Sequence, residues 1–266
     1  MSVKAKTLFS VVLVAASLLL VQARAYAQSD PPGVNRTHFW SYRLLDPFYF
    51  PQPVSLSDQF FRNLISNQTD TLTRLLNWVY KDANGAVQDT FIHYTWWNLI
   101  NKYPVGKLTK VTNQFGSYDV QVANMEFLLA PSWKNYQSPI PGGPLANHYL
   151  CYRAIGPAPP PQPHVFQDEW RQDVQDVGPL EFLCTPCLKY HNGQFFQPVD
   201  TLTHLAVYRI LPHSDAFYVQ LQDQFAHPQN IVQQSPPEYL FVPSLKYEIN
   251  TPTQRNTWGK LKTLYR

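Results

Sequence analysis

Four histidines recur along the chain at almost constant spacing, and imidazole can bind a metal ion or move a proton. They are His38, His93, His148 and His204, separated by 55, 55 and 56 residues. Histidine is a good ligand for zinc or copper, so four equivalent imidazoles around one axis would form a metal site. None of the four has a second ligand two or four residues away, which is not the spacing of a metal motif. We therefore expect structural histidines, each packed beside its own aromatic residue and bonded to a carbonyl or to the acid of its own unit, and no cofactor.

A second mark follows each histidine by about twenty residues: an acid or its amide, then Gln or Glu, then an aromatic residue. The triplets begin at Asp58, Asn113, Asp168 and Asp223, 55 residues apart. Such carboxylates could serve as catalytic acids or bases. The asparagine in one copy favours a turn or cap instead, because Asp and Asn share that chemistry. We predict no catalytic residue among them, and the sequence holds no Gly-x-Ser-x-Gly, phosphate-loop or His-Glu-x-x-His motif.

A third mark is a leucine-led run that ends in lysine, at Lys81, Lys134, Lys189 and Lys246. Three marks in the same order at a fixed period indicate a repeat architecture. A residue present in every copy is then expected to hold the fold together rather than to run one reaction. We divide the chain after its leader into a linker, four units and a tail: 28–36, 37–91, 92–146, 147–202, 203–250 and 251–266.

Residues 1–27 have the pattern of a secretory signal peptide. Lys4 and Lys6 give a basic start, residues 8–21 are apolar, and residues 25–27 read Ala-Tyr-Ala, a small-x-small cleavage site. The apolar stretch is too short for a membrane-spanning helix, and no later stretch is apolar enough to be one. We therefore expect an exported protein, secreted or periplasmic, with no membrane span in the mature chain.

The charge balance argues against a general attraction to nucleic acid or anionic lipid. The whole chain has 21 Lys and Arg against 18 Asp and Glu, and the leader holds three of the basic residues and none of the acids. The mature chain is therefore formally neutral and builds no broad positive field. We predict no nucleic-acid partner.

The composition indicates an all-β fold. Aromatic residues make up 15% of the chain, prolines number 24, and no long stretch has a convincing helical period; the nearest to one is 58–76. We expect about four short strands in each unit, with the units packed as tandem β modules in one body and a closed four-bladed toroid as the alternative. Prolines in the last strand are expected to stop ladder pairing there, at Pro131, Pro186 and Pro243.

The clearest strand opens each unit at its histidine. In the third unit, alternation sends His148, Leu150 and Tyr152 to one face of the strand. Tyr149 and Cys151 point to the other face. Both faces are largely apolar in every copy, which predicts interior strands that are covered on both sides.

The three cysteines permit one disulfide in an exported chain. Alignment of the units places Cys151 in a first strand and Cys184 in a last strand, at positions that are mostly apolar elsewhere. We predict a Cys151–Cys184 bridge and a free Cys187. The alternative bridge, Cys184–Cys187, needs a strained four-residue loop.

The third unit resembles a repeat found in secreted bacterial proteins, with the pattern H-x-x-C-Y, then V-x-x-x-D-Q-F, then L-C-x-P-x-x-K. The family is a domain of unknown function, so the resemblance implies export, β structure and repetition but no activity. The fourth unit lacks both cysteines, and the first two are more divergent. The residues that carry the resemblance are His148, Cys151, Tyr152, Asp168, Glu169, Trp170, Leu183, Cys184, Pro186 and Lys189.

Aromatic residues concentrate in the second unit, at Trp96, Trp97, Trp133 and Tyr136. Exposed rings could stack on sugars or on a partner's apolar surface. Because Trp96 and Trp97 point to opposite sides of one strand, at least one of them is expected to be core. Our leading hypothesis is a non-catalytic binding or structural protein that recognises a glycan or an extracellular protein. The alternative is a secreted hydrolase with its site in the variable loops, which differ between the copies.

Overall fold

The computed structural model describes residues 31–34, 37–82, 92–134, 146–210, 217–222, 225 and 229–249. The predicted signal peptide and the predicted C-terminal tail lie outside this range. Within it the protein is all-β, as predicted: fourteen strands join one antiparallel sheet, and no helix is present in the described segments. The strands are β1 His38–Tyr49, β2 Pro53–Ser57, β3 Ile65–Lys81, β4 His93–Leu99, β5 Pro104–Asn113, β6 Gly116–Lys134, β7 His148–Ile155, β8 His164–Gln167, β9 Gln172–Gln175, β10 Val177–His191, β11 Gln194–Phe196, β12 His204–Ile210, β13 Phe217–Gln222 and β14 Gln229–Glu248.

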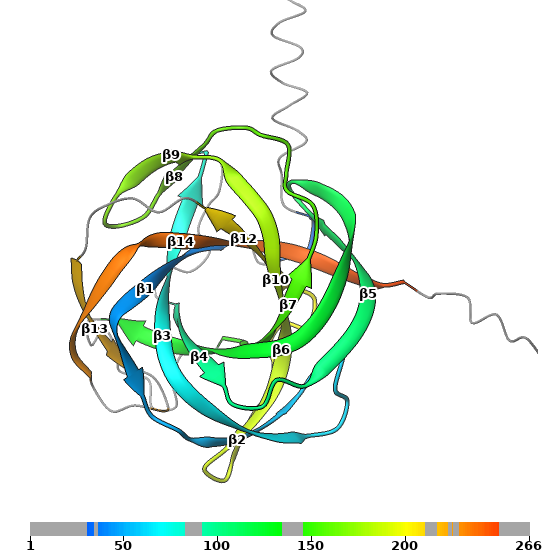
Figure 1. Cartoon of the computed structure of the whole chain (residues 1–266), viewed down its shortest axis with the longest axis vertical. Helices are drawn as coiled ribbons and strands as arrows, with labels where there is room; N and C mark the ends of the chain where they lie inside the picture. The colour runs from blue at the N-terminus through cyan, green and yellow to red at the C-terminus, as the bar shows by residue number, and fades with distance from the viewer. Residues whose placement is uncertain are drawn as a thin grey trace, which may run out of the picture.

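Eight strands pair in a closed circle, seen in Figure 1 as the ring around the middle of the molecule. The order around the circle is β1, β3, β4, β6, β7, β10, β12 and β14, and β14 pairs again with β1. Each sequence unit contributes its first strand, which begins at the marker histidine, and its long last strand. The circle therefore follows the order of the units along the chain.

Positions that the sequence alignment makes equivalent have equivalent partners in the sheet. The residue three places after each histidine pairs with the matching residue of the last strand in its own unit. One of these pairs is the disulfide. The four pairs are Ser41–Leu76, Trp96–Leu129, Cys151–Cys184 and Val207–Phe241.

The ring has an apolar core on each of its two faces, as the both-sided strand pattern predicts. The inner core joins strands that are not neighbours in the sheet: the ring of Trp96 on β4 lies 5.5 Å from Phe182 on β10 and 6.1 Å from Phe241 on β14. These contacts cross the interior of the ring. The outer core contains Trp40 and Tyr42 on the opposite strand face and extends to the outer strands.

The second strand of each unit pairs outside the ring with the end of the last strand of the unit opposite. The residue two places before each acid or amide mark pairs with the marker lysine of that opposite unit. First and third units exchange strands in this way, as do second and fourth, so every unit pairs with all three others. The four pairs are Leu56–Lys189, Val111–Lys246, Phe166–Lys81 and Leu221–Lys134.

One local expectation was wrong. The long strands continue through Pro131, Pro186 and Pro243. Each proline lies where its strand exchanges neighbours: β10 pairs with β12 only up to Cys184 and with β2 from Leu188 onward. A residue without an N–H is tolerated where one neighbour has ended.

The stretch 58–76, which comes closest to a helical period, contains the start of β3. Leu72 and Leu75 of that strand lie in the outer core, and Leu76 lies in the inner core. A strand that is buried on both faces can imitate the spacing of a helix, because apolar residues need not alternate.

Candidate functional site

Asp58 follows β2 and joins the first unit to the third. Its Oδ1 accepts hydrogen bonds from the backbone N–H groups of Phe60 and Phe61, at 2.8 and 2.9 Å, which hold the turn. Its Oδ2 accepts from the Tyr152 hydroxyl at 2.7 Å and from the Thr185 hydroxyl. Burial raises the pKa of Asp58, although all four hydrogen bonds oppose this shift. The carboxylate is therefore fully used by contacts within the protein.

Asp168 makes the reciprocal connection from the third unit to the first. It accepts hydrogen bonds from the Tyr42 hydroxyl and, at 3.1 Å, from the Asn77 amide. In the second unit Asn113 reverses the direction, because its amide donates to the Tyr208 hydroxyl at 2.9 Å in the fourth unit. Asp223 lies outside the described residues. The three described marks therefore serve as turns that also tie opposite units together.

The marker histidines lie on the outer face of the ring, on the same strand face as Trp40 and Tyr42, so they do not meet at its axis. The Nε2 atom of His38 accepts a hydrogen bond from the Gln114 amide, and that of His204 accepts from the Gln59 amide. In each case the glutamine belongs to the next unit around the ring. At His204 the expected bond to a backbone carbonyl is formed, and both histidines also contact a glutamine of another unit.

The surroundings of His204 keep its imidazole neutral. Its Nδ1–H donates to the Leu202 carbonyl at 2.8 Å, which leaves Nε2 as the acceptor for Gln59. Burial, reinforced by the nearby Lys246 charge, lowers the pKa of His204 to about 4. Among the described residues, no group of three or more His, Cys, Asp or Glu side chains is placed to hold a metal ion, and His93 and His148 belong to no such group either.

The marker lysines are also used within the protein. Lys189 is fully buried, with its Nζ 4.3 Å from the ring centre of Phe225 in the next unit. Nζ of Lys246 lies 4.5 Å from the ring centre of Phe60, and that of Lys81 lies 5.5 Å from Phe115. These cation–π contacts join three of the four marker lysines to the aromatic residue of the following unit, and the side chain of Lys134 lies outside the described residues.

The Cys151–Cys184 disulfide is present, as predicted, and joins β7 to β10 inside the ring. Cys187 is free and buried, so the alternative Cys184–Cys187 bridge is not formed. Burial, with a smaller contribution from the Asp58 charge, raises the pKa of the Cys187 thiol well above its ordinary value. This thiol is therefore unreactive in the folded protein.

Two of the four residues of the predicted binding platform, Trp96 and Trp97, are buried. Trp96 lies in the inner core, stacked on Phe127 with ring centres 3.4 Å apart. Trp97 lies in the outer core, 5.3 Å from Phe225. Both are buried because this strand is covered on both sides. The side chain of Trp133 and the whole of Tyr136 lie outside the described residues.

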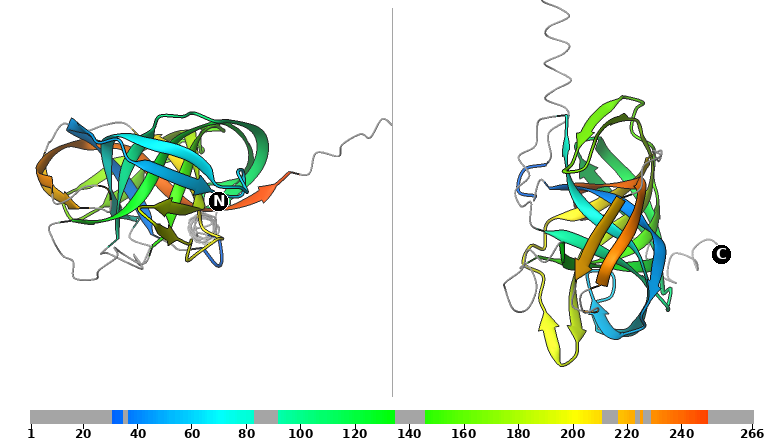
Figure 2. Two further views of the ribbon diagram at one scale, coloured as in Figure 1. Left: turned by 90° about the horizontal axis from the view of Figure 1, so that it is seen from below. Right: turned by 90° about the vertical axis from the view of Figure 1, so that its left-hand side faces the viewer.

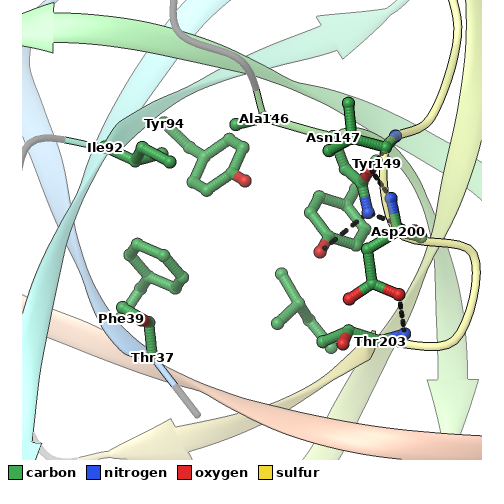
Figure 3. Close-up of a pocket in the computed structure, with 11 residues that line it drawn as sticks. Thr37, Phe39, Ile92, Tyr94, Ala146, Asn147, Tyr149, Asp200 and Thr203 are labelled. Carbon is green, nitrogen blue, oxygen red and sulfur yellow. Dashed lines mark hydrogen bonds between the residues drawn. The ribbon is translucent and has the colours of Figure 1, made fainter. Parts of the chain in front are cut away.

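A pocket opens at the end of the ring where the four first strands begin (Figure 3). The cavity is about 70 Å³. Its walls come mainly from positions directly before and after the marker histidines, so equivalent positions of all four units meet here. No local pattern in the sequence predicts this site, although the constant offset of its residues from each histidine locates it once the ring is known. The lining residues are Thr37, Phe39, Ile92, Tyr94, Ala146, Asn147, Tyr149, Val199, Asp200, Thr203 and Leu205.

Asn147 and Asp200 fix one wall of this pocket. The side-chain Oδ1 atom of Asn147 accepts hydrogen bonds from the backbone N–H groups of Val199 and Asp200, at 2.8 and 3.0 Å. One oxygen of Asp200 accepts from the backbone N–H groups of Leu202 and Thr203, at 2.8 and 3.1 Å. In Figure 3 its other oxygen points toward the middle of the pocket. A carboxylate is thus held rigidly at the edge of an aromatic-lined hollow.

Arg74 stands at the inner position that aromatic residues hold in the other three units. Its guanidinium lies 4.6 Å from the ring centre of Trp96 and donates to Glu238 at 2.8 Å. A charged side chain therefore takes the place of an aromatic ring in the interior of the sheet.

One further polar cluster lies at the rim of the molecule, where β3 meets β8. Asp82 Oδ2 is 2.8 Å from Nδ1 of His164 and 2.5 Å from Nζ of Lys81. Burial opposes ionisation of Asp82, but the hydrogen bonds from His164 and Lys81 outweigh it and hold the pKa of Asp82 below its usual range. Asp82 and His164 lie 82 residues apart in sequence, so no local pattern predicts this cluster.

Comparisons with known proteins agree with a repeat fold and supply no activity. Within the described residues, no helix is both long and apolar enough to cross a membrane. No curated protein and no solved structure matches the chain significantly. A family profile matches residues 93–243, which begin at the marker histidine His93 and end at Pro243 in the last strand of the fourth unit. The chain belongs to the family described as "Repeat of unknown function (DUF7450)".

Proposed function

We propose that the protein is an exported, non-catalytic binding protein that recognises part of a carbohydrate at the mouth of its ring. The observation that carries this proposal is how the polar residues are used. The described acid and amide marks, two of the marker histidines and three of the marker lysines make contacts that join one unit to another. In the pocket, by contrast, aromatic rings and one oxygen of Asp200 face open space.

The composition of the pocket suits a hydroxylated ligand. Phe39, Tyr94 and Tyr149 supply aromatic surface, which stacks on sugar rings. Asn147 and Asp200 are held in place by backbone hydrogen bonds, which preorganises the polar wall. The cavity of about 70 Å³ admits one edge of a sugar ring rather than a whole saccharide. A disulfide is consistent with an oxidising, extracytoplasmic compartment.

Glycan-array binding by the mature chain tests this proposal. Ala146 lines the mouth, and the Ala146→Phe change should fill it and reduce any specific glycan signal at least tenfold. The matched control is Ile155→Phe, at the far and exposed end of β7, the strand that begins at the mouth. Binding that survives in Ala146→Phe, or no binding by the native chain to any glycan, would contradict the proposal.

A secreted hydrolase remains a second candidate because of one observation, the carboxylate–imidazole pair of Asp82 and His164. A carboxylate that orients a histidine is a common part of hydrolytic sites. The competing explanation is that the pair fixes a turn, since Asp82 has a φ of 52° and also accepts a hydrogen bond from the Val165 backbone N–H at 2.9 Å. Turnover of a glycoside or ester substrate that His164→Gln abolishes, without loss of fold, would favour the hydrolase.

A further inference from the structure

We propose that the mouth pocket selects a ligand with a primary ammonium group, of the amino-sugar class, and that Asp200 is the counter-charge. This inference rests on the proposed binding function and specifies its ligand. Three features of the pocket support it: the orientation of one carboxylate oxygen toward the hollow, the aromatic walls around it and the lack of a basic side chain among the described residues of the lining.

Asp200 is positioned as a binding group rather than as part of an ion pair. One of its oxygens is occupied by the N–H groups of Leu202 and Thr203. The other points into the hollow in Figure 3, and no ion pair found among the described residues includes Asp200. The side chain is half-buried, so a charge placed beside it is partly shielded from water. A cation there would gain a charge-assisted hydrogen bond.

The aromatic side chains favour the same kind of group. The rings of Phe39 and Tyr94 lie 5.2 Å apart, and those of Tyr94 and Tyr149 lie 5.8 Å apart, so three rings line adjoining sides of the hollow. Aromatic faces attract ammonium groups, and such clusters recognise organic cations in other proteins. In Figure 3 the Tyr94 hydroxyl points toward the middle of the pocket, where it can meet a ligand hydroxyl or N–H.

The size and charge of the pocket limit which ligand groups it can bind. A cavity of about 70 Å³ suits a small group such as an ammonium and its attached carbon. Among the described residues of the lining only Asp200 is charged, so it would repel a carboxylate or phosphate ligand. The hydroxyl-rich walls favour an amine that also carries hydroxyl groups.

Calorimetric titration of the whole mature chain tests the inference with four probes: glucosamine, N-acetylglucosamine, glucose and n-butylamine. Glucosamine should bind at least tenfold more tightly than each of the others, because only it combines the ammonium group with the sugar hydroxyls. Asp200→Asn keeps the oxygen that accepts the two backbone hydrogen bonds and removes the charge. It should weaken glucosamine binding about tenfold and bring it level with glucose.

Asp119→Asn is the matched control, since Asp119 is an exposed carboxylate paired with Lys110 on the outer hairpin, and it should leave every affinity unchanged. Equal binding of glucosamine and its neutral relatives would overturn the inference, as would glucosamine binding that is unchanged in Asp200→Asn. Equal binding of butylamine would overturn the assignment to amino sugars. Sugar binding that Ala146→Phe abolishes but that ignores charge would leave the proposed function standing without this inference. No sugar binding at all would contradict both.

Discussion

The acid and amide marks show how one side-chain position can serve a fold in two chemical forms. Asp58 accepts hydrogen bonds from a tyrosine hydroxyl, whereas Asn113 donates to one. A hydroxyl can do either, so the tyrosine of the opposite unit tolerates both residues. In both cases the Oδ1 atom accepts from the backbone N–H two residues later. The residue type therefore varies while the connection between opposite units is kept.

This equivalence predicts different outcomes for two substitutions at Asp58. Asp58→Ala removes the acceptor for four hydrogen bonds in a buried site and should lower the free energy of unfolding by about 3–5 kcal/mol. Asp58→Asn keeps the turn and lets the amide donate to Tyr152, so it should cost about 1 kcal/mol or less. Urea denaturation of the three proteins measures both values. Equal losses in the two variants would contradict this view of the site.

His204 predicts a pH dependence of stability. Its pKa in the folded protein is about 4, below its ordinary value of 6.5, so the unfolded chain binds more protons between these two pH values. Stability must therefore fall as pH falls from about 6.5 to about 4, by roughly 2–4 kcal/mol from this group. Denaturation of the native chain and of His204→Gln across this range tests it. The variant should start less stable at pH 7 and show a flatter pH profile, whereas parallel profiles would contradict the assignment.

At the scale of elements, the sequence could predict which stretches are first strands and which positions in a unit pair. The pairing of Cys151 with Cys184 follows from alignment of the units, because equivalent positions of a repeat have equivalent partners. The β10–β11 hairpin, which projects from the body in the right-hand view of Figure 2, also has a local signature. Its turn residues Asn192 and Gly193 both have positive φ, at 48° and 77°, as a tight two-residue hairpin requires.

The disulfide predicts a measurable contribution to stability from the β7–β10 pair. It closes a loop between residues separated by 33 positions, which should contribute about 3–4 kcal/mol in the chain-entropy model. The double variant Cys151→Ser, Cys184→Leu installs the Ser41–Leu76 pair of the first unit at the same place in the sheet. This double variant should fold, and its free energy of unfolding should be about 3–4 kcal/mol lower than that of the native chain.

The control for the disulfide is Cys187→Ser, which places in the third unit the residue found at the matching positions of the second and fourth units, Ser132 and Ser244. It should keep the native disulfide, seen by peptide mapping without reductant. A loss in Cys187→Ser as large as that in the double variant would show that the disulfide is not the source of the stability.

At the scale of the whole molecule, the sequence could not predict the partners between units. A constant period shows which residues are equivalent and not which copies meet. Gln59 contacts His204 across 145 residues, and Asp58 contacts Tyr152 across 94, because the second strand of each unit pairs with the unit opposite. Trp97 illustrates the consequence, since the outer layer that buries it is contributed by Phe225 of the opposite unit.

The pocket follows the same rule. Phe39, Tyr94, Tyr149 and Leu205 are equivalent positions in four units, and they become neighbours only when the ring closes. The sequence could therefore predict buried apolar side chains at these positions but not a cavity between them. Asp200 belongs to the connector before the fourth unit, in a segment that differs between copies. Variable connectors on a repeated frame commonly carry the individual function.

Hydrogen exchange read by mass spectrometry, with the native chain compared with Asp58→Ala, tests most directly whether the four units form one interlocked body. Each unit pairs with the other three, so the units should unfold together. In Asp58→Ala the free energy of opening should therefore fall by the same amount for protected amides in β4, β7, β10 and β12. Uniform loss across all four units is the predicted result. Loss confined to the first and third units, with β4 and β12 as protected as in the native chain, would contradict it.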